Sequence, residues 1–241
     1  VGPPFYHKLI IPFLIPFLLI MAIGPKLKWI KSNLDDKIYL ITFLIVSILL
    51  SILIVKNFSS NFLINTILIS SAFYLFFITL RDFFIKGFKN LAQNIAHFGF
   101  SLLILSILFN SLFSSEIITN LKVGQTFENT KAKIVFESIS QKEAKNYRSI
   151  IGNFTVQDSK GKIENLSPEL RIYNQPNITT SEADIKTTLL SDKFIVINIV
   201  QNQEFFNVRY QVKPFMLWIW ISVILISFGG LISFLKKGYE K

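Results

Sequence analysis

Polar side chains recur at a helical spacing within Asn90–Phe113, a run that is otherwise rich in leucine, isoleucine and phenylalanine. At 100° per residue they share an arc of about 100° on one side of a helix. These residues are Asn90, Gln93, Asn94, His97 and Ser101. An ionisable side chain such as His97 is costly in a membrane-spanning helix unless it has a partner. The pattern therefore predicts a helix whose polar face points away from lipid.

Residue type alone leaves two interpretations of His97 open. A neutral imidazole can ligate a metal or relay a proton, which would make this face a functional site. Alternatively, the ring makes a structural hydrogen bond to a neighbouring helix. If His97 is a ligand, Gln93, Asn94 and Ser101 are the side chains on the same face that could hold its second ring nitrogen.

The elements that must position this face are membrane helices. Hydrophobic residues make up 51% of the 241-residue chain, 25 residues are phenylalanine, and only 17% are charged. This composition is typical of a polytopic α-helical membrane protein. Apolar runs predict helices at about 9–23, 38–55, 62–80 and 91–113, and a fifth within 214–241. In the last run, Gly229-Gly230 permits close approach of another helix, and Trp218 and Trp220 are typical of a membrane interface.

The start of the chain is expected to be irregular. Val1–Tyr6 contains Gly-Pro-Pro, which predicts a turn, and Pro12 and Pro16 predict a kinked or short first helix. The chain begins with valine and has no signal-like segment, so we expect a fragment or a trimmed form of a longer protein.

The net charge of +10 is concentrated beside the apolar runs. Residues 115–213 are nearly balanced, with 13 Lys/Arg against 11 Asp/Glu. Basic residues instead follow the first, third and fifth runs, as the positive-inside rule describes for short loops. This predicts an N-terminus outside, a C-terminus inside, and residues 115–213 in the periplasm or intermembrane space. The same distribution gives no support for nucleic-acid binding.

Residues 115–213 are the predicted soluble domain, and their alternating pattern is typical of β-strands. Strands are expected at Lys133–Ser140, Ile150–Gln157, Glu169–Ile172, Phe194–Val200 and Phe205–Val212. A capping-box pattern in Thr179–Asp184 predicts one short helix. The expected fold is therefore a helical membrane protein with about five transmembrane helices and a β-rich soluble domain inserted between the fourth and fifth.

Missing residue types exclude several kinds of site. The chain has no cysteine, so it can form neither a disulfide nor a thiolate metal site. It also lacks a glycine-rich phosphate loop and a GxSxG elbow, which disfavours ATPases and serine hydrolases. No catalytic residue can be assigned from the sequence.

His7 is the only other histidine, and the predicted topology places it far from His97. His97 lies about seven residues, roughly 10 Å, from the inner edge of its helix. His7 lies at the outer edge of a hydrocarbon core about 30 Å thick, so roughly 20 Å should separate the two. If His97 ligates a metal, the opposite ligand must come from another chain or from residues before Val1.

Two other functional classes remain open. One is a proton-coupled transporter, in which a membrane-embedded histidine would be expected. Against this class, no Asp or Glu lies inside the five predicted spans and the chain shows no internal repeat. The other class is a purely structural membrane anchor for the outer domain.

Several segments together resemble the C-terminal part of the CcmF-type cytochrome c biogenesis family, the haem lyase subunit of a cytochrome c maturation system. The resemblance extends over nearly the whole chain and rests on the order and spacing of its segments. They are VGPPFY at Val1–Tyr6, GPKLKW at Gly24–Trp29, NIAHFGFSLLILSI at Asn94–Ile107, PELRIYNQP at Pro168–Pro176, TTSEADIKTTLLSDKFI at Thr179–Ile195, and VRYQVKPFMLWIW with FGGLIS within Val208–Ser233.

The resemblance implies that His97 is one axial ligand of a resident haem b, whose iron takes its opposite ligand from an earlier helix outside this chain. In the family, this haem keeps an incoming haem reduced during its attachment to the CxxCH thiols of apocytochrome c. The family's haem-delivery site, a tryptophan-rich segment with two outer histidines, lies upstream of Val1.

The resemblance also implies partners and a location. The partners are apocytochrome c, the N-terminal part of the same protein or a split subunit, and other maturation subunits, including the haem chaperone and the subunit that handles apocytochrome thiols. The location is the bacterial inner (cytoplasmic) membrane, with the mitochondrial inner membrane as the alternative.

Overall fold

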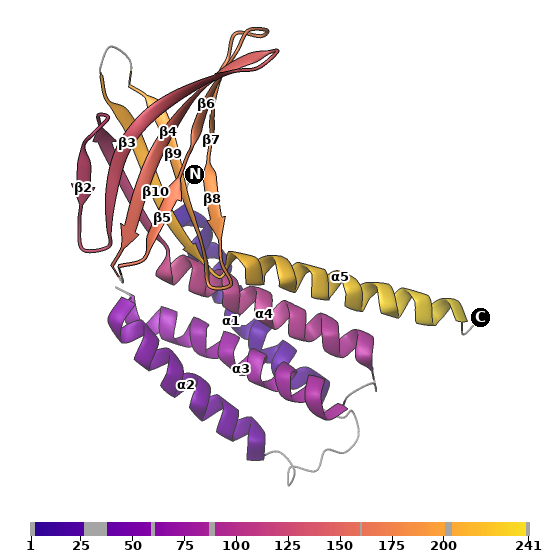
Figure 1. The fold of residues 1–241 in the computed structure, drawn as a ribbon. Helices are drawn as coiled ribbons and strands as arrows, with labels where there is room; N and C mark the ends of the chain where they lie inside the picture. Colours follow the sequence, from indigo (N-terminus) through magenta and orange to yellow (C-terminus); the bar gives the residue numbers. More distant parts are fainter. Residues whose placement is uncertain are drawn as a thin grey trace. The chain divides into compact units, whose positions relative to one another are not determined.

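The computed structural model describes the backbone of residues 3–26, 38–58, 61–86, 90–159, 161–200 and 204–239. The chain divides into a helical unit, Val1–Phe113 with Trp218–Lys241, and a β unit, Ser114–Leu217. Figure 1 shows the helices and strands of each. All the strands lie between the fourth and fifth helices along the chain, so the predicted fold class is confirmed.

Five helices of the helical unit are each long and apolar enough to cross a membrane. In lipid, a spanning segment must satisfy its backbone hydrogen bonds internally, which is why long apolar runs form helices. Their bounds are α1 (Pro3–Ile23), α2 (Ile38–Phe58), α3 (Phe62–Lys86), α4 (Leu91–Phe113) and α5 (Met216–Tyr239), with a short 3-10 turn, η1 (Gly24–Lys26), after α1. Most of the basic connection predicted after α1, residues 28–37, lies outside the described residues.

Helix α1 begins earlier than the sequence predicted. It starts at Pro3, inside the stretch that was expected to be a turn. Because the first N–H groups of a helix have no intrahelical acceptor, prolines in the first turn cost no hydrogen bond. Pro12 and Pro16 lie within the same helix. The side chain of His7 is outside the described residues, so its separation from His97 stays a prediction.

Helix α3 is the central helix of this unit. It contacts α1, α2 and α4, and 56% of its apolar span is buried, against 11–28% for the other four. Many leucine, isoleucine and phenylalanine side chains of α1, α2 and α5 are exposed, which suits contact with lipid tails of similar polarity. The buried core consists chiefly of Leu18, Ala22, Val55, Leu68, Ile69, Ala72, Leu75, Ile78 and Leu105.

Two glycines allow α5 to approach α4 closely. A Cβ atom added at Gly99 would lie 2.9 Å from the Cβ atom of Leu225, and one added at Gly229 would lie 2.8 Å from the carbonyl oxygen of Ala92. Both distances are shorter than a normal van der Waals contact. The predicted role of Gly229 is thus confirmed, while a Cβ atom at Gly230 would meet nothing within 4 Å.

The β unit consists of two antiparallel sheets. One sheet has the strand order β1-β10-β9-β8, and the other has the order β2-β3-β4-β6-β7 with β5 paired to β4. The strands are β1 (Ser115–Leu121), β2 (Thr126–Glu128), β3 (Ala132–Glu143), β4 (Tyr147–Asp158), β5 (Ile163–Leu166), β6 (Glu169–Tyr173), β7 (Thr179–Glu182), β8 (Asp184–Thr187), β9 (Ser191–Ile199) and β10 (Phe206–Pro214).

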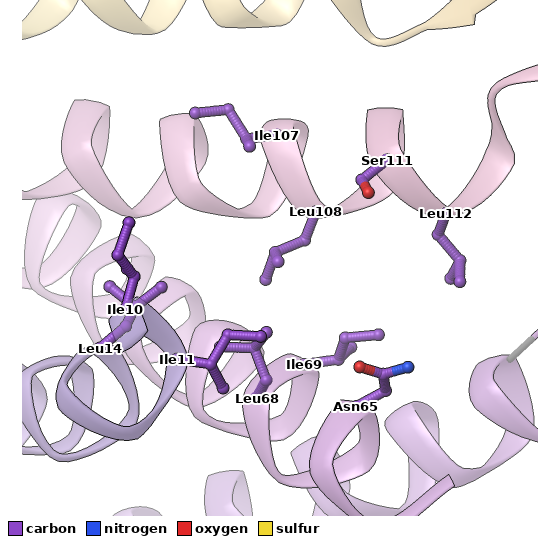
Figure 2. Close-up of a pocket in the computed structure, with 10 residues that line it drawn as sticks. All are labelled: Ile10, Ile11, Leu14, Asn65, Leu68, Ile69, Ile107, Leu108, Ser111 and Leu112. Atoms are coloured by element: carbon purple, nitrogen blue, oxygen red, sulfur yellow. The ribbon is translucent and has the colours of Figure 1, made fainter. Parts of the chain in front are cut away.

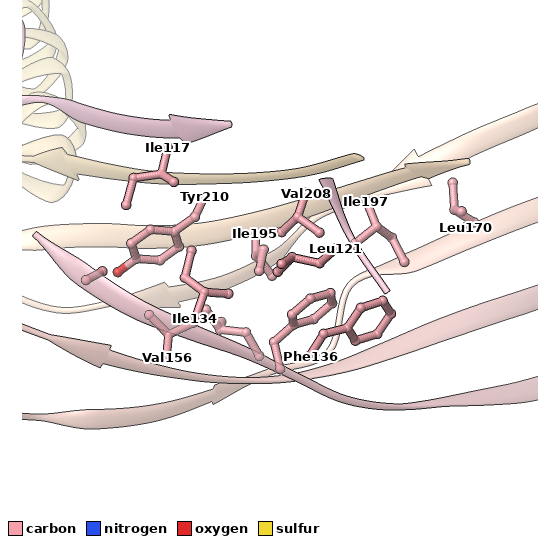
Figure 3. Packing of buried hydrophobic residues seen from close by; sticks show 13 residues of the cluster. Ile117, Leu121, Ile134, Phe136, Val156, Leu170, Ile195, Ile197, Val208 and Tyr210 are labelled. Atoms are coloured by element: carbon pink, nitrogen blue, oxygen red, sulfur yellow. The ribbon is translucent and has the colours of Figure 1, made fainter. Parts of the chain in front are cut away.

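The two sheets enclose one hydrophobic core, shown in Figure 3. The rings of Phe136 and Phe154, on neighbouring strands of one sheet, are stacked with centroids 4.3 Å apart. Ile195, Ile197 and Val208 of the other sheet are completely buried in the same cluster. Alternating strand residues point into this core, and that alternation is the reason the pattern was visible in the sequence.

All five predicted strands are present, as β3, β4, β6, β9 and β10, although Val200 and Phe205 lie just outside β9 and β10. The helix predicted in Thr179–Asp184 is wrong, because this segment forms β7 and the start of β8. Thr180 pairs with Arg171 of β6, and Asp184 pairs with Ile195 of β9. Ladder hydrogen bonds to two neighbouring strands therefore outweigh the local capping signal, as tertiary context commonly does.

A lysine joins the two sheets at one end of the β unit. The Lys193 ammonium on β9 lies 3.1 Å from a carboxylate oxygen of Asp158 on β4 and 3.2 Å from one of Glu164 on β5. Burial by itself would raise the pKa of Glu164. Ion pairs with Lys162 and Lys193 outweigh burial, so the pKa is lowered.

We predict that Glu164→Gln destabilises the β unit at neutral pH by about 1–3 kcal/mol, because Lys193 loses one of two buried carboxylates. A lowered folded-state pKa means that this contribution is present above the pKa of the unfolded carboxyl. It is lost as the pH falls through the folded-state pKa. The difference between variant and wild type should therefore shrink in acid. Hydrogen exchange of β9 amides in the full chain, measured as a function of pH, tests this.

The matched control is Glu128→Gln, which removes an exposed partner of Lys133 in the same unit. It should change the free energy of opening by less than about 1 kcal/mol. Equal effects of the two substitutions would contradict the role given to Lys193.

Candidate functional site around His97

His97 lines a small polar cavity at one end of the helical unit. The cavity has a volume of about 20 Å³ and is lined by Pro25, Thr79, Asp82, Gln93, Asn94 and His97. Three of these residues come from α4, two from α3 and one from η1. The sequence had predicted the α4 residues of this group, and the structure brings them together with polar side chains of α3.

The polar face of α4 is only partly turned inward. Asn94 is 6% exposed and Ser101 is completely buried, while His97 is half-buried and Asn90 and Gln93 are exposed. Ser101 does not line the cavity. Its hydroxyl lies 2.7 Å from the hydroxyl of Thr79, with which it shares a hydrogen bond. Of the predicted supporting residues, Gln93 and Asn94 are beside His97, and Ser101 is connected to the cavity only through Thr79.

Aromatic contacts between α3 and α4 fix which side of α4 meets this cavity. The ring of Phe98, the residue after His97, packs against Phe76 at 5.8 Å and Phe83 at 5.6 Å, measured between centroids. Phe76 and Phe83 lie on α3 on either side of Thr79 along the chain. Ring packing of this kind stabilises the contact between two helices beyond the effect of buried apolar area alone. It therefore holds Thr79 near the buried face of α4.

An ion pair that sequence analysis missed borders the same cavity. Asp82 accepts a hydrogen bond from the Lys26 ammonium, and the two side chains are 13% and 8% exposed. The third span was predicted to end at Leu80, but α3 continues to Lys86 and its apolar span includes Asp82. The predicted end of the third span is therefore too early, and the helix as observed contains one acidic residue. The sequence did indicate that Asp82 could belong to this site, because it follows Thr79 by about one helical turn.

The residues around His97 could provide one axial ligand of a haem, but they do not form a complete haem site. A cavity of about 20 Å³ is far smaller than the 300–1,000 Å³ of ordinary cofactor pockets. Among the described residues, no group of three or more His, Cys, Asp or Glu could hold a metal ion. A half-buried imidazole backed by hydrogen-bonding groups nevertheless has the chemistry of a single axial ligand.

A second, larger cavity lies further along α4 and is apolar (Figure 2). It has a volume of about 400 Å³ between α1, α3 and α4. Along α4, Ile107 follows His97 by ten residues, which corresponds to roughly 15 Å of helix. The cavity shares no lining residue with the one at His97 and has no titratable lining. Its lining consists of Ile10, Ile11, Leu14, Asn65, Leu68, Ile69, Ile107, Leu108, Ser111 and Leu112.

Comparison with known proteins finds relatives that are similar to the whole chain. The family described as the CcmF C-terminal β-sandwich matches residues 112–214. The cytochrome c-type biogenesis protein CcmF of Pseudomonas fluorescens is 26% identical over all of this chain, and that of Escherichia coli is 25% identical over all of it. Residues 112–214 thus match the CcmF C-terminal β-sandwich, and the whole chain is similar to CcmF proteins.

The match covers 38% of the length of the CcmF protein from P. fluorescens and 39% of that from E. coli. The chain therefore spans about two fifths of these relatives and corresponds to the C-terminal part of CcmF. A solved structure described as cytochrome c haem lyase CcmF superimposes with a TM-score of 0.71. It is 17% identical and covers 95% of this chain and 40% of that one. At this identity the superposition shows the shared fold.

The similarity to CcmF proteins extends over the whole chain. The suspected resemblance to CcmF is thus confirmed, as is the insertion of a β-sandwich between the fourth and fifth helices.

We predict that Asp82→Asn destabilises the helical unit, because it removes the carboxylate that neutralises the buried Lys26 ammonium. The expected loss is on the order of 3 kcal/mol, as for other broken buried pairs. Thermal unfolding in detergent, followed by far-ultraviolet circular dichroism, would report it as a lower Tm.

The double variant Lys26→Met, Asp82→Asn should recover part of the loss, since neither charge then remains alone. Lys56→Met is the control, because it removes an exposed lysine near the end of α2. An Asp82→Asn chain as stable as wild type would contradict a stabilising role for the pair.

Proposed function

We propose that this chain forms the C-terminal part of a haem lyase for c-type cytochromes, with His97 as one axial ligand of a resident haem b. The observation that carries the proposal is a half-buried imidazole beside a polar cavity, in a chain that matches CcmF proteins over its full length. In this proposal the opposite axial ligand comes from the rest of the haem lyase.

The groups around the cavity would set the orientation of the His97 ring. A ligating histidine commonly donates its other ring N–H to a carboxylate, carbonyl or other acceptor, which fixes the tautomer and raises the basicity of the ligand. Asn94 is the best placed of the predicted supporting residues because it is buried and lines the cavity. Asp82 is a further acceptor in the same lining. Ser101 would act only by holding Thr79 in place.

When bound, the resident haem would supply the electron that keeps an incoming haem reduced during its attachment to apocytochrome c. The contribution of this chain is to hold the imidazole within an apolar bundle. Low solvent access and the hydrogen bonds of the axial ligand both adjust the reduction potential of a haem.

The β-sandwich is proposed to dock apocytochrome c and the other maturation subunits, among them the haem chaperone and the subunit that handles apocytochrome thiols. We place it on the periplasmic side of a bacterial inner membrane, with the N-terminal end of this segment outside and the C-terminus inside. The bacterial relatives support this location over the mitochondrial alternative. The Lys26–Asp82 pair also supports it, because the ends of α1 and α3 then lie together on the side with excess basic residues.

Replacing His97 with alanine should abolish the bis-imidazole absorption spectrum of haem b, because the iron loses one axial ligand. The variant would be expressed in the whole haem lyase, or together with the remaining part, and purified for absorption spectroscopy. His7→Ala carries the same substitution on the other histidine and should leave the spectrum unchanged. A His97→Ala protein with an unaltered b-type spectrum would exclude the ligand role.

Asn94→Ala should weaken haem retention by about 10–100-fold, the usual effect of removing a residue that orients a ligand. Ser101→Ala should have the smaller effect, because Ser101 lies outside the cavity lining. Titration of released haem against an apoprotein acceptor measures both, and the reverse order would show that Asn94 is not the supporting residue.

A further inference from the structure

The turn between β8 and β9 presents two leucines where polar residues are usual. Thr188 and Ser191 close the turn, with the Thr188 N–H donating to the Ser191 carbonyl at 3.0 Å and the Ser191 N–H donating to the Thr188 hydroxyl at 3.1 Å. At the tip, Leu189 is 70% exposed and Leu190 is 68% exposed. Turn tips favour glycine, proline, asparagine, aspartate and serine. Hydrogen bonds therefore close the turn, and its tip has no evident reason to be apolar in water.

Hydrogen bonds place this tip beside the point where the chain enters α5. Ser191 pairs with Pro214, the last residue of β10. The Phe215 N–H donates to the carbonyl oxygen of Leu190 at 2.9 Å. Helix α5 begins at the next residue, Met216. One residue spans less than about 4 Å, so Leu190 lies close to the first turn of a helix that crosses the membrane.

The first turns of α5 also carry the residues that mark a membrane interface. Trp218 and Trp220 follow Met216 by about 3 Å and 6 Å along the helix axis, and tryptophan is enriched at the level of lipid head groups. The other connection agrees, since α4 ends at Phe113 and Ser115 of β1 pairs with Val212. Both connections to spanning helices thus leave the same end of the sandwich.

We propose that Leu189 and Leu190 insert into the lipid interface of the adjacent leaflet and anchor this end of the sandwich to the bilayer. Basic side chains of neighbouring turns at the same end suit anionic head groups. Lys131 and Lys162 are exposed there. The Ser159 N–H donates to the Lys131 carbonyl, and the Asp158 N–H donates to the carbonyl of Lys162, whose ammonium pairs with Glu164. The proposal is independent of haem binding, because none of these residues belongs to the cavity at His97.

The absence of cysteine makes a direct test possible, because single cysteines can be labelled without background. The variants are Leu189→Cys and Leu190→Cys, with Ile178→Cys as the control. Ile178 is also exposed, at 49%, but it precedes β7 at the opposite end of the β7–β8 segment. Each full-length chain would carry an environment-sensitive fluorophore and be reconstituted into vesicles of phosphatidylethanolamine and phosphatidylglycerol.

Labels at positions 189 and 190 should be quenched severalfold more by nitroxide-bearing lipids than by iodide in the buffer, and the label at 178 should show the reverse preference. Quenching by iodide at all three positions would overturn the proposal. Protection of positions 189 and 190 from both quenchers would also overturn it, because it would mean that a protein surface covers the turn. Circular dichroism confirms that each variant is folded.

Discussion

The helical unit depends on satisfying polar side chains within a bundle that is otherwise apolar. Lipid offers no hydrogen-bond partner, so hydroxyl groups in spanning helices bond to their own backbone or to another helix. Ser47 donates to the Phe43 carbonyl, Ser71 donates to the Leu68 carbonyl, and Thr79 and Ser101 meet across two helices. The last contact joins the central helix α3 to the helix that carries His97. The cavity at His97 therefore lies where the polar faces of α3 and α4 coincide.

Much of this architecture could be predicted from composition and periodicity, and the errors occurred where another segment decides the outcome. The five helices and five of the strands follow from apolar run length and from alternation, which are local properties. The segment from Thr179 to Asp184 is short and polar, so its pairing with β6 and β9 outweighs its capping pattern. The end of α3 was missed because charged residues were taken as the end of the helix. Asp82 is nevertheless stabilised inside α3 by its ion pair with Lys26 of η1.

In the candidate site, too, local features could be predicted from the sequence and contacts between helices could not. The helical period correctly grouped Gln93, Asn94 and His97, since these residues share a face of one helix. It could not identify Thr79 and Asp82 as their neighbours, because the rotation of α3 against α4 is set by the packing of phenylalanine rings between the helices. Nor could it separate Asn94, which lines the cavity, from Ser101, which does not.

The close crossing of α4 and α5 has a consequence for the history of this chain. At Gly99 and Gly229 even a methyl group would collide with the opposing helix. Substitutions at these two sites should therefore be selected against, while the surrounding leucines and isoleucines can replace one another. Such a pair of invariant small residues, one near the histidine and one near the C-terminus, would form a sparse signature. Diverged homologues whose overall similarity has faded could still be recognised by it.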